Sequence, residues 1–251
     1  MLFTSPLEQF LIIPIFSTFY ITVTNETIFL SLIIILSFIF FFAMRHNERN
    51  SFYIILKNYQ FALQKVYSFM LFTTVKNINH PRGQEFFPLI FSIFFSILLL
   101  NLVGLVPNSF ALTSHLIVTF GLSLSLFIGS TIICILRHQA DFFNLFLPHG
   151  TPFVLSLLLV PIEVISYFFK PISLAIRLFA NLMAGHALMH VIAGFGFSFF
   201  LSSNIGVYVV QYVPVLIIFA LFLLDTAVCT IQAFVFSILI SIYLNDSMNL
   251  H

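Results

Sequence analysis

Charge is almost absent from the second half of the chain, and this constrains the fold more than any other feature. Between Lys170 and Asp225 the only Lys, Arg, Asp or Glu is Arg177, and His186 and His190 follow it closely. The whole chain is 61% hydrophobic and 7% charged, whereas soluble domains carry about 25% charged residues. Such a composition cannot cover a surface with polar groups in water, so we expect an integral membrane protein.

Apolar tracts separate the charged positions, and several are long enough to cross a bilayer, which takes about 20 helical residues. The sequence therefore predicts an all-α membrane protein with about five membrane-embedded helices in a single domain over residues 1–251. A first transmembrane helix is expected over 27–44, a transmembrane hairpin over 86–136 and a longer helix hairpin over 150–245.

The segment 45–82 differs, because it holds six of the nine basic residues, mixed with apolar positions at near-helical spacing. This pattern is typical of a helix that lies in the membrane interface. The positive-inside rule puts such a segment on the inner side. Alternating spans then predict that the N-terminus lies outside and the C-terminus inside.

The last two apolar tracts, 150–197 and 205–245, are too long for upright spans. About 45 helical residues reach roughly 65 Å, against a hydrocarbon core of about 30 Å. These helices must be strongly tilted or broken, and Pro161, Pro171 and Pro214 offer places to bend. Two long inclined helices packed side by side form a wall.

Polar residues in these two tracts fall on defined helical faces. Glu163, Lys170 and Arg177 are spaced by sevens and share one face, which Asn181 joins at i+4. The histidines His186 and His190 look the opposite way, and Asp225 and Gln232 share a face of the last tract.

This layout predicts a polar path from each side of the membrane, with Arg177 between them. Histidine and carboxylate groups can take and give protons in an intramembrane relay. Arginine cannot release its proton in a protein, so Arg177 would act as a barrier between two half-paths.

Other interpretations of the same residues stay open. Arg177 could pair with a carboxylate and lock two helices, and Lys170 could extend to the inner surface. The histidines could be packing residues, or their i, i+4 spacing could hold a divalent metal ion. Asn181 and Gln232 could tie helices together by hydrogen bonds. Cys134 and Cys229 lie in apolar segments, which favours buried thiols over a disulfide.

The tract RLFANLMAGH at 177–186, preceded by PIEVISYFFKPISLAI and followed by IQAFVFSILISIYLND, resembles subunit a of the rotary ATP synthases. SPLEQF at 5–10 and NLVGLVPNSFALTSH at 101–115 are also similar to that family, especially to mitochondrial members of plants and algae. The resemblance covers the chain from about residue 5 to its end.

The resemblance implies a non-catalytic stator subunit beside a rotating ring of c subunits, together with a peripheral stalk and other membrane-sector subunits. In that family protons enter one half-channel, neutralise a ring carboxylate and leave by the other. The family's arginine falls on Arg177, which would lower the pKa of each returning ring carboxylate and prevent a direct leak. Its positioning asparagine and glutamine fall on Asn181 and Gln232.

The resemblance also assigns the two half-channels. His186 and the acidic position Asp225 fall in the outer-side half-channel, and Glu163 falls in the inner, matrix-side one. A water molecule or His190 would complete the outer relay. Mitochondrial relatives usually carry Glu where Asp225 stands, so the reach is shorter here by about one methylene. The implied location is the mitochondrial inner membrane, with the N-terminus toward the intermembrane space and the C-terminus toward the matrix.

Two other function classes compete with this one. A stand-alone ion-coupled secondary transporter would need inverted repeats or discontinuous helices, and the sequence shows neither. A structural anchor of a respiratory complex would not need a polar path. No nucleic-acid partner is expected from a net charge of +1 without a basic patch, and no cofactor is required.

Overall fold

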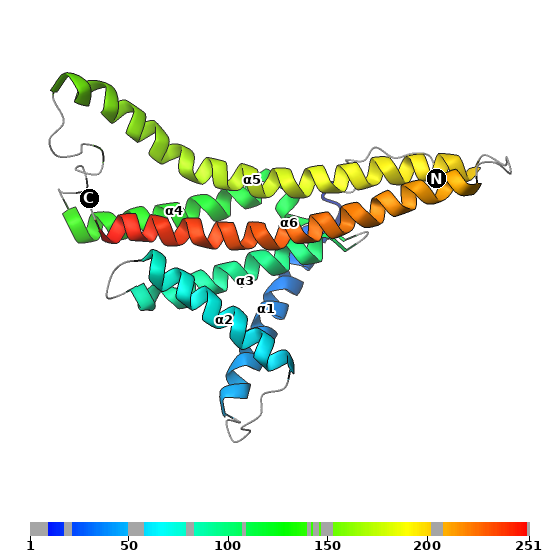
Figure 1. Ribbon diagram of the computed structural model, residues 1–251, viewed down its shortest axis with the longest axis horizontal. Helices are drawn as coiled ribbons and strands as arrows, with labels where there is room; N and C mark the ends of the chain where they lie inside the picture. The colour runs from blue at the N-terminus through cyan, green and yellow to red at the C-terminus, as the bar shows by residue number, and fades with distance from the viewer. Residues whose placement is uncertain are drawn as a thin grey trace. The chain divides into compact units, whose positions relative to one another are not determined.

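A computed structural model describes residues 10–17, 22–49, 58–78, 83–106, 109–139, 142, 146, 153–201 and 208–249 (Figure 1). Its elements in chain order are the strands β1 (Pro14–Ser17) and β2 (Thr22–Thr24), the helix α1 (Asn25–Arg49), α2 (Asn58–Asn77), the 3-10 helix η2 (Gly83–Phe86), α3 (Phe87–Gly104), the 3-10 helix η3 (Leu112–Ser114), α4 (Leu116–His138), α5 (Phe153–Leu201) and α6 (Tyr208–Met248).

The helical membrane class is confirmed. Among the described residues, four stretches are long and apolar enough to cross a membrane, namely Gly83–Gly104, Leu116–His138, Ser156–Ser198 and Tyr212–Met248. The expected first span corresponds to α1, in which Asn25–Ile39 forms a shorter apolar helix. The basic segment 45–82 contains the end of α1 and all of α2, and its interfacial position stays a prediction.

The two long tracts form continuous helices rather than broken ones. The 49 residues of α5 contain Pro161 and Pro171, and the 41 residues of α6 contain Pro214, without ending either helix. Membrane helices tolerate proline where neighbouring groups satisfy the freed backbone. Helices of this length reach roughly 60 to 75 Å, about twice the hydrocarbon core, so they must tilt steeply or leave the core.

Contacts divide the chain into two compact units, and the boundary between them cuts α1, α3, α4, α5 and α6. Unit 1 comprises Met1–Phe41, Ser96–Val118 and Arg177–Gln232, and unit 2 comprises Phe42–Phe95, Thr119–Ile176 and Ala233–His251. Each unit has its own helix packing. The expectation of a single domain over 1–251 stays a prediction.

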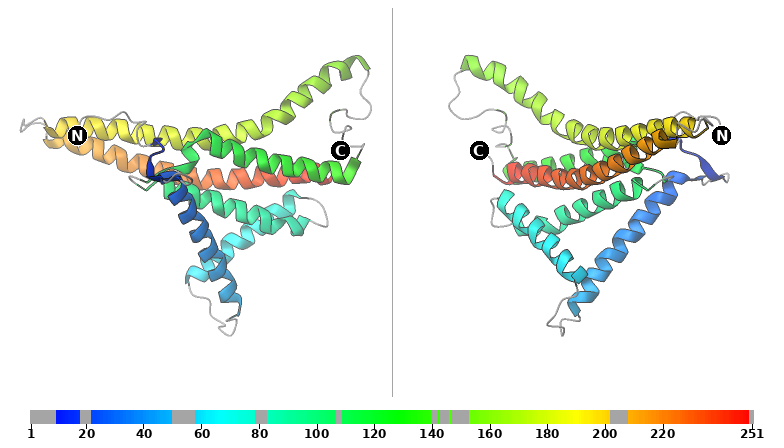
Figure 2. Two further views of the ribbon diagram at one scale, coloured as in Figure 1. Left: turned by 180° about the vertical axis from the view of Figure 1, so that it is seen from behind. Right: turned by 45° about the vertical axis from the view of Figure 1, so that its right-hand side comes forward.

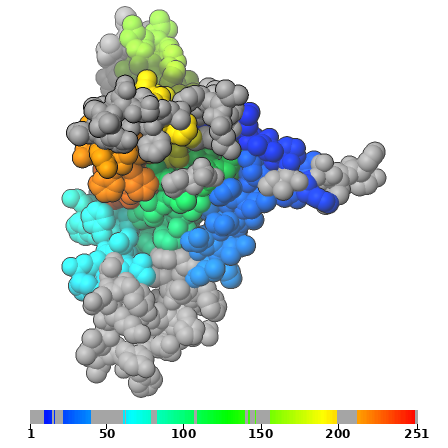
Figure 3. All heavy atoms as spheres, turned by 90° about the vertical axis from the view of Figure 1, so that its right-hand side faces the viewer, coloured from blue at the N-terminus to red at the C-terminus, as the bar shows by residue number. Residues whose placement is uncertain are grey.

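In unit 1 the ends of α5 and α6 that flank their connection lie side by side, as both views of Figure 2 show in yellow and orange. Gly185 lies against Asp225, and Gly196 lies against Pro214. Between the two contacts the residue number rises by eleven on α5 and falls by eleven on α6. Eleven residues are about three helical turns. The two helices are therefore antiparallel in a fixed register. Figure 3 looks onto this end of the pair.

In unit 2 the helices approach through small polar residues. The buried side chains of α4 recur every three or four positions and so form one face, comprising Thr119, Ser123, Phe127, Ser130 and Cys134. On α6 Ser237 and Ser241 are buried as well, and the Ser241 hydroxyl donates to the Ile238 carbonyl and accepts from Asn77 Nδ2 at 3.0 Å. Small residues let membrane helices come close, and back-bonding satisfies their hydroxyl groups.

A short antiparallel strand pair precedes α1, and the sequence did not predict it. β1 pairs with β2 with one irregularity between Pro14 and Phe16. The pair leads directly into α1, where the Thr24 hydroxyl accepts from the Thr27 backbone N–H at 3.4 Å and the Thr27 hydroxyl accepts from the Thr24 backbone N–H at 3.1 Å. This reciprocal capping satisfies N–H groups that have no partner inside the helix.

The α5–α6 register can be tested by cross-linking. A Cβ placed on Gly196 would lie 3.2 Å from the Pro214 Cβ, and disulfides join Cβ atoms about 3.5–4.5 Å apart. We expect Gly196→Cys with Pro214→Cys to form a disulfide on mild oxidation, in a Cys134→Ala, Cys229→Ala background, as detected by mass spectrometry.

The matched control is Gly196→Cys with Val215→Cys, since the neighbouring position points about 100° away around α6. Equal cross-linking in both pairs would contradict the register.

Candidate functional site

Arg177 stands on an exposed face of α5. Together with Ala180, Ala184, Leu188 and Val191 it forms a row of exposed residues spaced by three or four positions. Within the described parts of the chain, its guanidinium group has no hydrogen bond or ion pair. The alternative that Arg177 locks two helices of this chain by pairing with a carboxylate therefore has no support among these residues.

His186 lies on the opposite, buried face of α5, as the helical phase predicts. It follows Leu178 and Leu182 at intervals of four residues, and all three side chains are buried. The ring lies beside the backbone of Gly104 at the end of α3. The Nε2 atom is buried and has no hydrogen-bond partner among the described residues. A buried, unpaired ring nitrogen is a site where a water molecule or a proton carrier can bind.

Asp225 on α6 faces α5 at a glycine. If Gly185 carried a Cβ, that atom would lie 2.5 Å from Asp225 Oδ2 and 2.9 Å from its Cγ. The carboxylate thus occupies the space in which a side chain at position 185 would stand. Only glycine leaves this space open, so Gly185 allows the short Asp225 side chain to reach the α5 backbone, one residue before His186.

The histidines and Asp225 do not form an ion pair with one another among the described residues. His190 is exposed, whereas His186 is buried. No group of three His, Cys, Asp or Glu side chains comes together in the described part of the chain. A divalent ion at His186 and His190 would therefore need further ligands from elsewhere, and the metal interpretation stays a prediction.

The remaining sequence candidates are half-buried. Asn181 and Gln232 belong to unit 1, like Arg177 and Asp225, but Glu163 lies in unit 2. The described residues offer none of these three a hydrogen-bond partner. Their roles as positioning residues and as the inner half-channel acid stay predictions.

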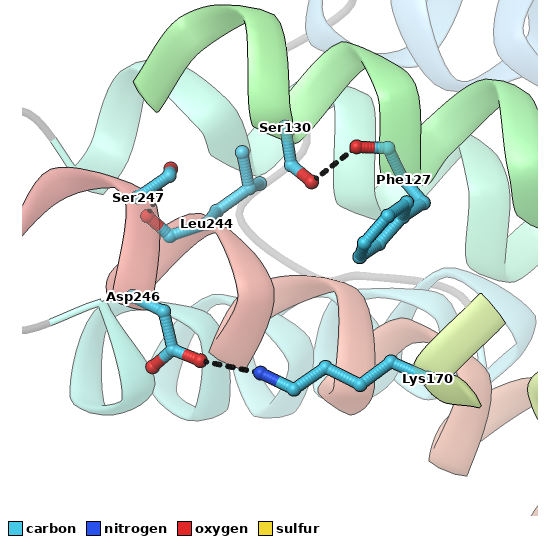
Figure 4. A network of polar contacts seen from close by, with 6 residues as sticks. All are labelled: Phe127, Ser130, Lys170, Leu244, Asp246 and Ser247. Atoms are coloured by element: carbon cyan, nitrogen blue, oxygen red, sulfur yellow. Dashed lines mark hydrogen bonds and ion pairs between the residues drawn. The ribbon is translucent and has the colours of Figure 1, made fainter. Parts of the chain in front are cut away.

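Unit 2 holds an ion pair of its own, shown in Figure 4. Lys170 Nζ on α5 lies 3.2 Å from Asp246 Oδ2 on α6, and both side chains are about one-third exposed (33% and 34%). The ammonium group also lies 5.6 Å from the Tyr167 ring centre and 5.3 Å from that of Tyr243. Aromatic faces attract cations at such distances, so the rings add to the attraction of the carboxylate.

Comparison with known proteins identifies the family. The sequence model described as "ATP synthase A chain" matches residues 26–245. The chain belongs to this family. It is 42% identical to "ATP synthase subunit a" of Marchantia polymorpha over 253 residues, covering 98% of this chain and 99% of that one. It is 42% identical to the protein of that name in Pylaiella littoralis over 254 residues, all of both chains, and 39% identical to that of Acanthamoeba castellanii over 249 residues, 98% of each.

The structure also brings out two polar residues that the sequence analysis did not single out. Asp246 is the partner of Lys170. Asn101 on α3 is 1% exposed, and its Nδ2 donates to the Cys229 carbonyl on α6 at 3.4 Å. A signal for Asp246 was available, because it follows Gln232 by fourteen residues and so lies close to its helical face. For Asn101 the signal was a single amide within an apolar tract.

The ion pair of unit 2 can be measured by a double-mutant cycle. We expect Lys170→Met and Asp246→Asn each to lower the midpoint temperature of unfolding, and the double variant to lose less than the sum. Because both partners are one-third exposed, the coupling should be about 0.2–1 kcal/mol.

The control pairs Lys170→Met with Glu85→Gln, an exposed acid of η2 in the same unit. That cycle should show no coupling. Strict additivity between positions 170 and 246 would mean that the contact contributes nothing to stability.

Proposed function

We propose that this chain is the proton-translocating stator subunit of a rotary ATP synthase, and that it forms two offset half-channels separated by Arg177. Membership of the ATP synthase A chain family supports a non-catalytic role in the membrane sector. The observation that carries the finer proposal is the exposed, unpaired Arg177 on one face of α5 and the buried His186 on the other.

The position of Arg177 supports a partner outside this chain. A permanent cation on an exposed face of an apolar membrane helix costs about 2.5–3.5 kcal/mol at the bilayer centre. A carboxylate from another subunit offsets this cost, and a ring of c subunits presents one carboxylate after another. The exposed neighbours Ala180 and Ala184 are small, which lets a second helix approach Arg177 closely.

In this mechanism Arg177 separates two protonation events. On one side a ring carboxylate is neutralised before it enters lipid. On the other side it returns toward Arg177, whose charge lowers the carboxylate pKa and drives proton release. Because the guanidinium does not give up its proton, no proton passes directly between the two half-channels. Asn181 and Gln232, in the same unit as Arg177, position this contact.

The half-channels use the other polar residues. The outer path leads through His186, His190 and Asp225, and the contact of Asp225 with Gly185 supports a relay that reaches α5 beside His186. The inner path contains Glu163. The membrane is the mitochondrial inner membrane, with the N-terminus toward the intermembrane space. The basic residues of 45–82 support this orientation.

A stand-alone secondary transporter is the alternative. Such proteins bind substrate where membrane helices are interrupted. The unbroken α5 and α6 argue against that architecture. If the chain is a stator subunit and not a transporter, it should co-purify with a proteolipid ring. The isolated chain should then transport nothing.

Removal of the fixed charge tests the barrier. We expect Arg177→Ala to abolish ATP-driven proton pumping in membrane vesicles and to raise passive proton flux through the membrane sector, because nothing then separates the half-channels. Passive flux is measured as the decay of an imposed pH gradient after the catalytic sector is removed. Intact coupled pumping in this variant would mean that Arg177 is not the barrier.

The outer path is tested at the contact between α5 and α6. We expect Asp225→Asn to slow passive flux without producing a leak, since the relay loses its titratable group. Gly185→Ala should slow it as well, because a methyl group there displaces the Asp225 carboxylate.

The matched control is Gly129→Ala on α4, where a Cβ meets nothing within 4 Å. Normal flux in Gly185→Ala would show that the position of the Asp225 carboxylate does not matter for transport.

A further inference from the structure

We infer that Phe10, the last residue of the SPLEQF motif, positions the His186 ring for proton transfer. The family resemblance includes this motif, but no role in the proposed mechanism uses it. The inference rests on the proposed function, because it concerns the outer half-channel to which His186 is assigned.

Phe10 touches His186 directly. The two ring centres are 6.1 Å apart and the ring planes stand at 86°, an edge-to-face arrangement. Aromatic pairs favour this geometry over direct stacking. Phe10 is itself half-buried, and His186 is only 7% exposed. The ring of Phe10 therefore forms part of the cover over the imidazole.

The imidazole also lies beside the backbone of Gly104 at the end of α3. Packing against Phe10 restricts rotation of the ring, whose Nε2 is buried and has no hydrogen-bond partner among the described residues. A transfer group works best when its orientation is set in advance, so the two contacts together prepare His186 for its role.

Phe10 is held in place by Asn25 at the start of α1. The Asn25 Nδ2 donates to the Leu11 carbonyl at 3.1 Å, and its Oδ1 accepts from the Ile13 N–H at 3.2 Å. The Asn25 backbone N–H donates in turn to the Ile13 carbonyl at 3.2 Å. These bonds attach Leu11 and Ile13, which follow Phe10 closely, to the first residue of α1. The start of α1 therefore fixes the position of the segment that contains Phe10. All of these residues belong to unit 1.

The two short strands extend this attachment. Pro14 of β1 pairs with Thr24 of β2, next to the directly bonded residues Ile13 and Asn25. The strand pair thus helps to join the N-terminal segment to the start of α1.

The test is a double-mutant cycle on passive proton flux through the membrane sector of the assembled complex. We expect Phe10→Ala to lower the flux about three- to ten-fold, as is typical of residues in direct contact. Phe10→Tyr should restore most of it, because the ring is kept. In a His186→Ala background, Phe10→Ala should have no further effect.

Two variants separate positioning from general damage to the N-terminal segment. Phe16→Ala removes an exposed aromatic ring from β1. Among the described residues, this ring does not contact His186. This substitution should leave flux unchanged. Asn25→Asp keeps the Oδ1 acceptor but loses the donor to the Leu11 carbonyl, and it should lower flux in the same direction as Phe10→Ala.

The outcomes are distinguishable. If His186→Ala alone leaves flux unchanged, the outer half-channel assignment fails, and this inference fails with it. If His186→Ala lowers flux but Phe10→Ala does not, or lowers it equally with and without His186, the inference alone is wrong. If Phe16→Ala lowers flux as much as Phe10→Ala, the effect belongs to the strand pair and not to the ring contact.

Discussion

The cost of an unpaired charge in an apolar environment is the constraint on which the rest of this structure depends. The two longest helices carry few charged groups, and the two cations of α5 differ in whether they have a partner within the chain. Lys170 is neutralised within the chain by Asp246 and two aromatic rings. Arg177, seven residues later, has no partner among the described residues and faces outward. The helix α5 therefore contains one cation, Lys170, that is paired within the chain, and a second, Arg177, that is free to pair with another subunit.

Helix existence and helical face were predictable from the sequence, because both follow from local rules. Apolar length predicted α3, α4, α5 and α6 to within a few residues, and the bilayer sets that length. The phase of about 100° per residue predicted that His186 and Arg177 lie on opposite faces. The sequence left open whether the long tracts are tilted or broken, and the helices continue through Pro161, Pro171 and Pro214. Neighbouring helices can satisfy the backbone groups that a proline frees.

Contacts between helices were not predictable, because they depend on register. The sequence interpretation placed Asp225 near the histidines, but it could not show that its carboxylate reaches α5 at Gly185. Nor could it pair Lys170 with Asp246, which are 76 residues apart. The short strands were missed for a related reason, since three or four residues carry too little periodicity to distinguish a strand from a loop.

The side chain of His186 is contacted by elements from several parts of the chain, which bears on its proposed role in the outer half-channel. A long helix can place an imidazole at a given depth, but its side chain keeps rotational freedom. Here Gly104 of α3 and Phe10 of the N-terminal segment contact the same ring, and Asp225 of α6 lies against the preceding residue of α5. Three elements distant in sequence therefore restrict one short stretch of α5.

On the opposite face, Arg177 is unrestrained by the described residues, as expected if its orientation is set by each carboxylate that arrives from a moving partner. Under the proposed function, one face of α5 would carry a fixed proton-transfer group and the opposite face a charge that adjusts to each arriving carboxylate.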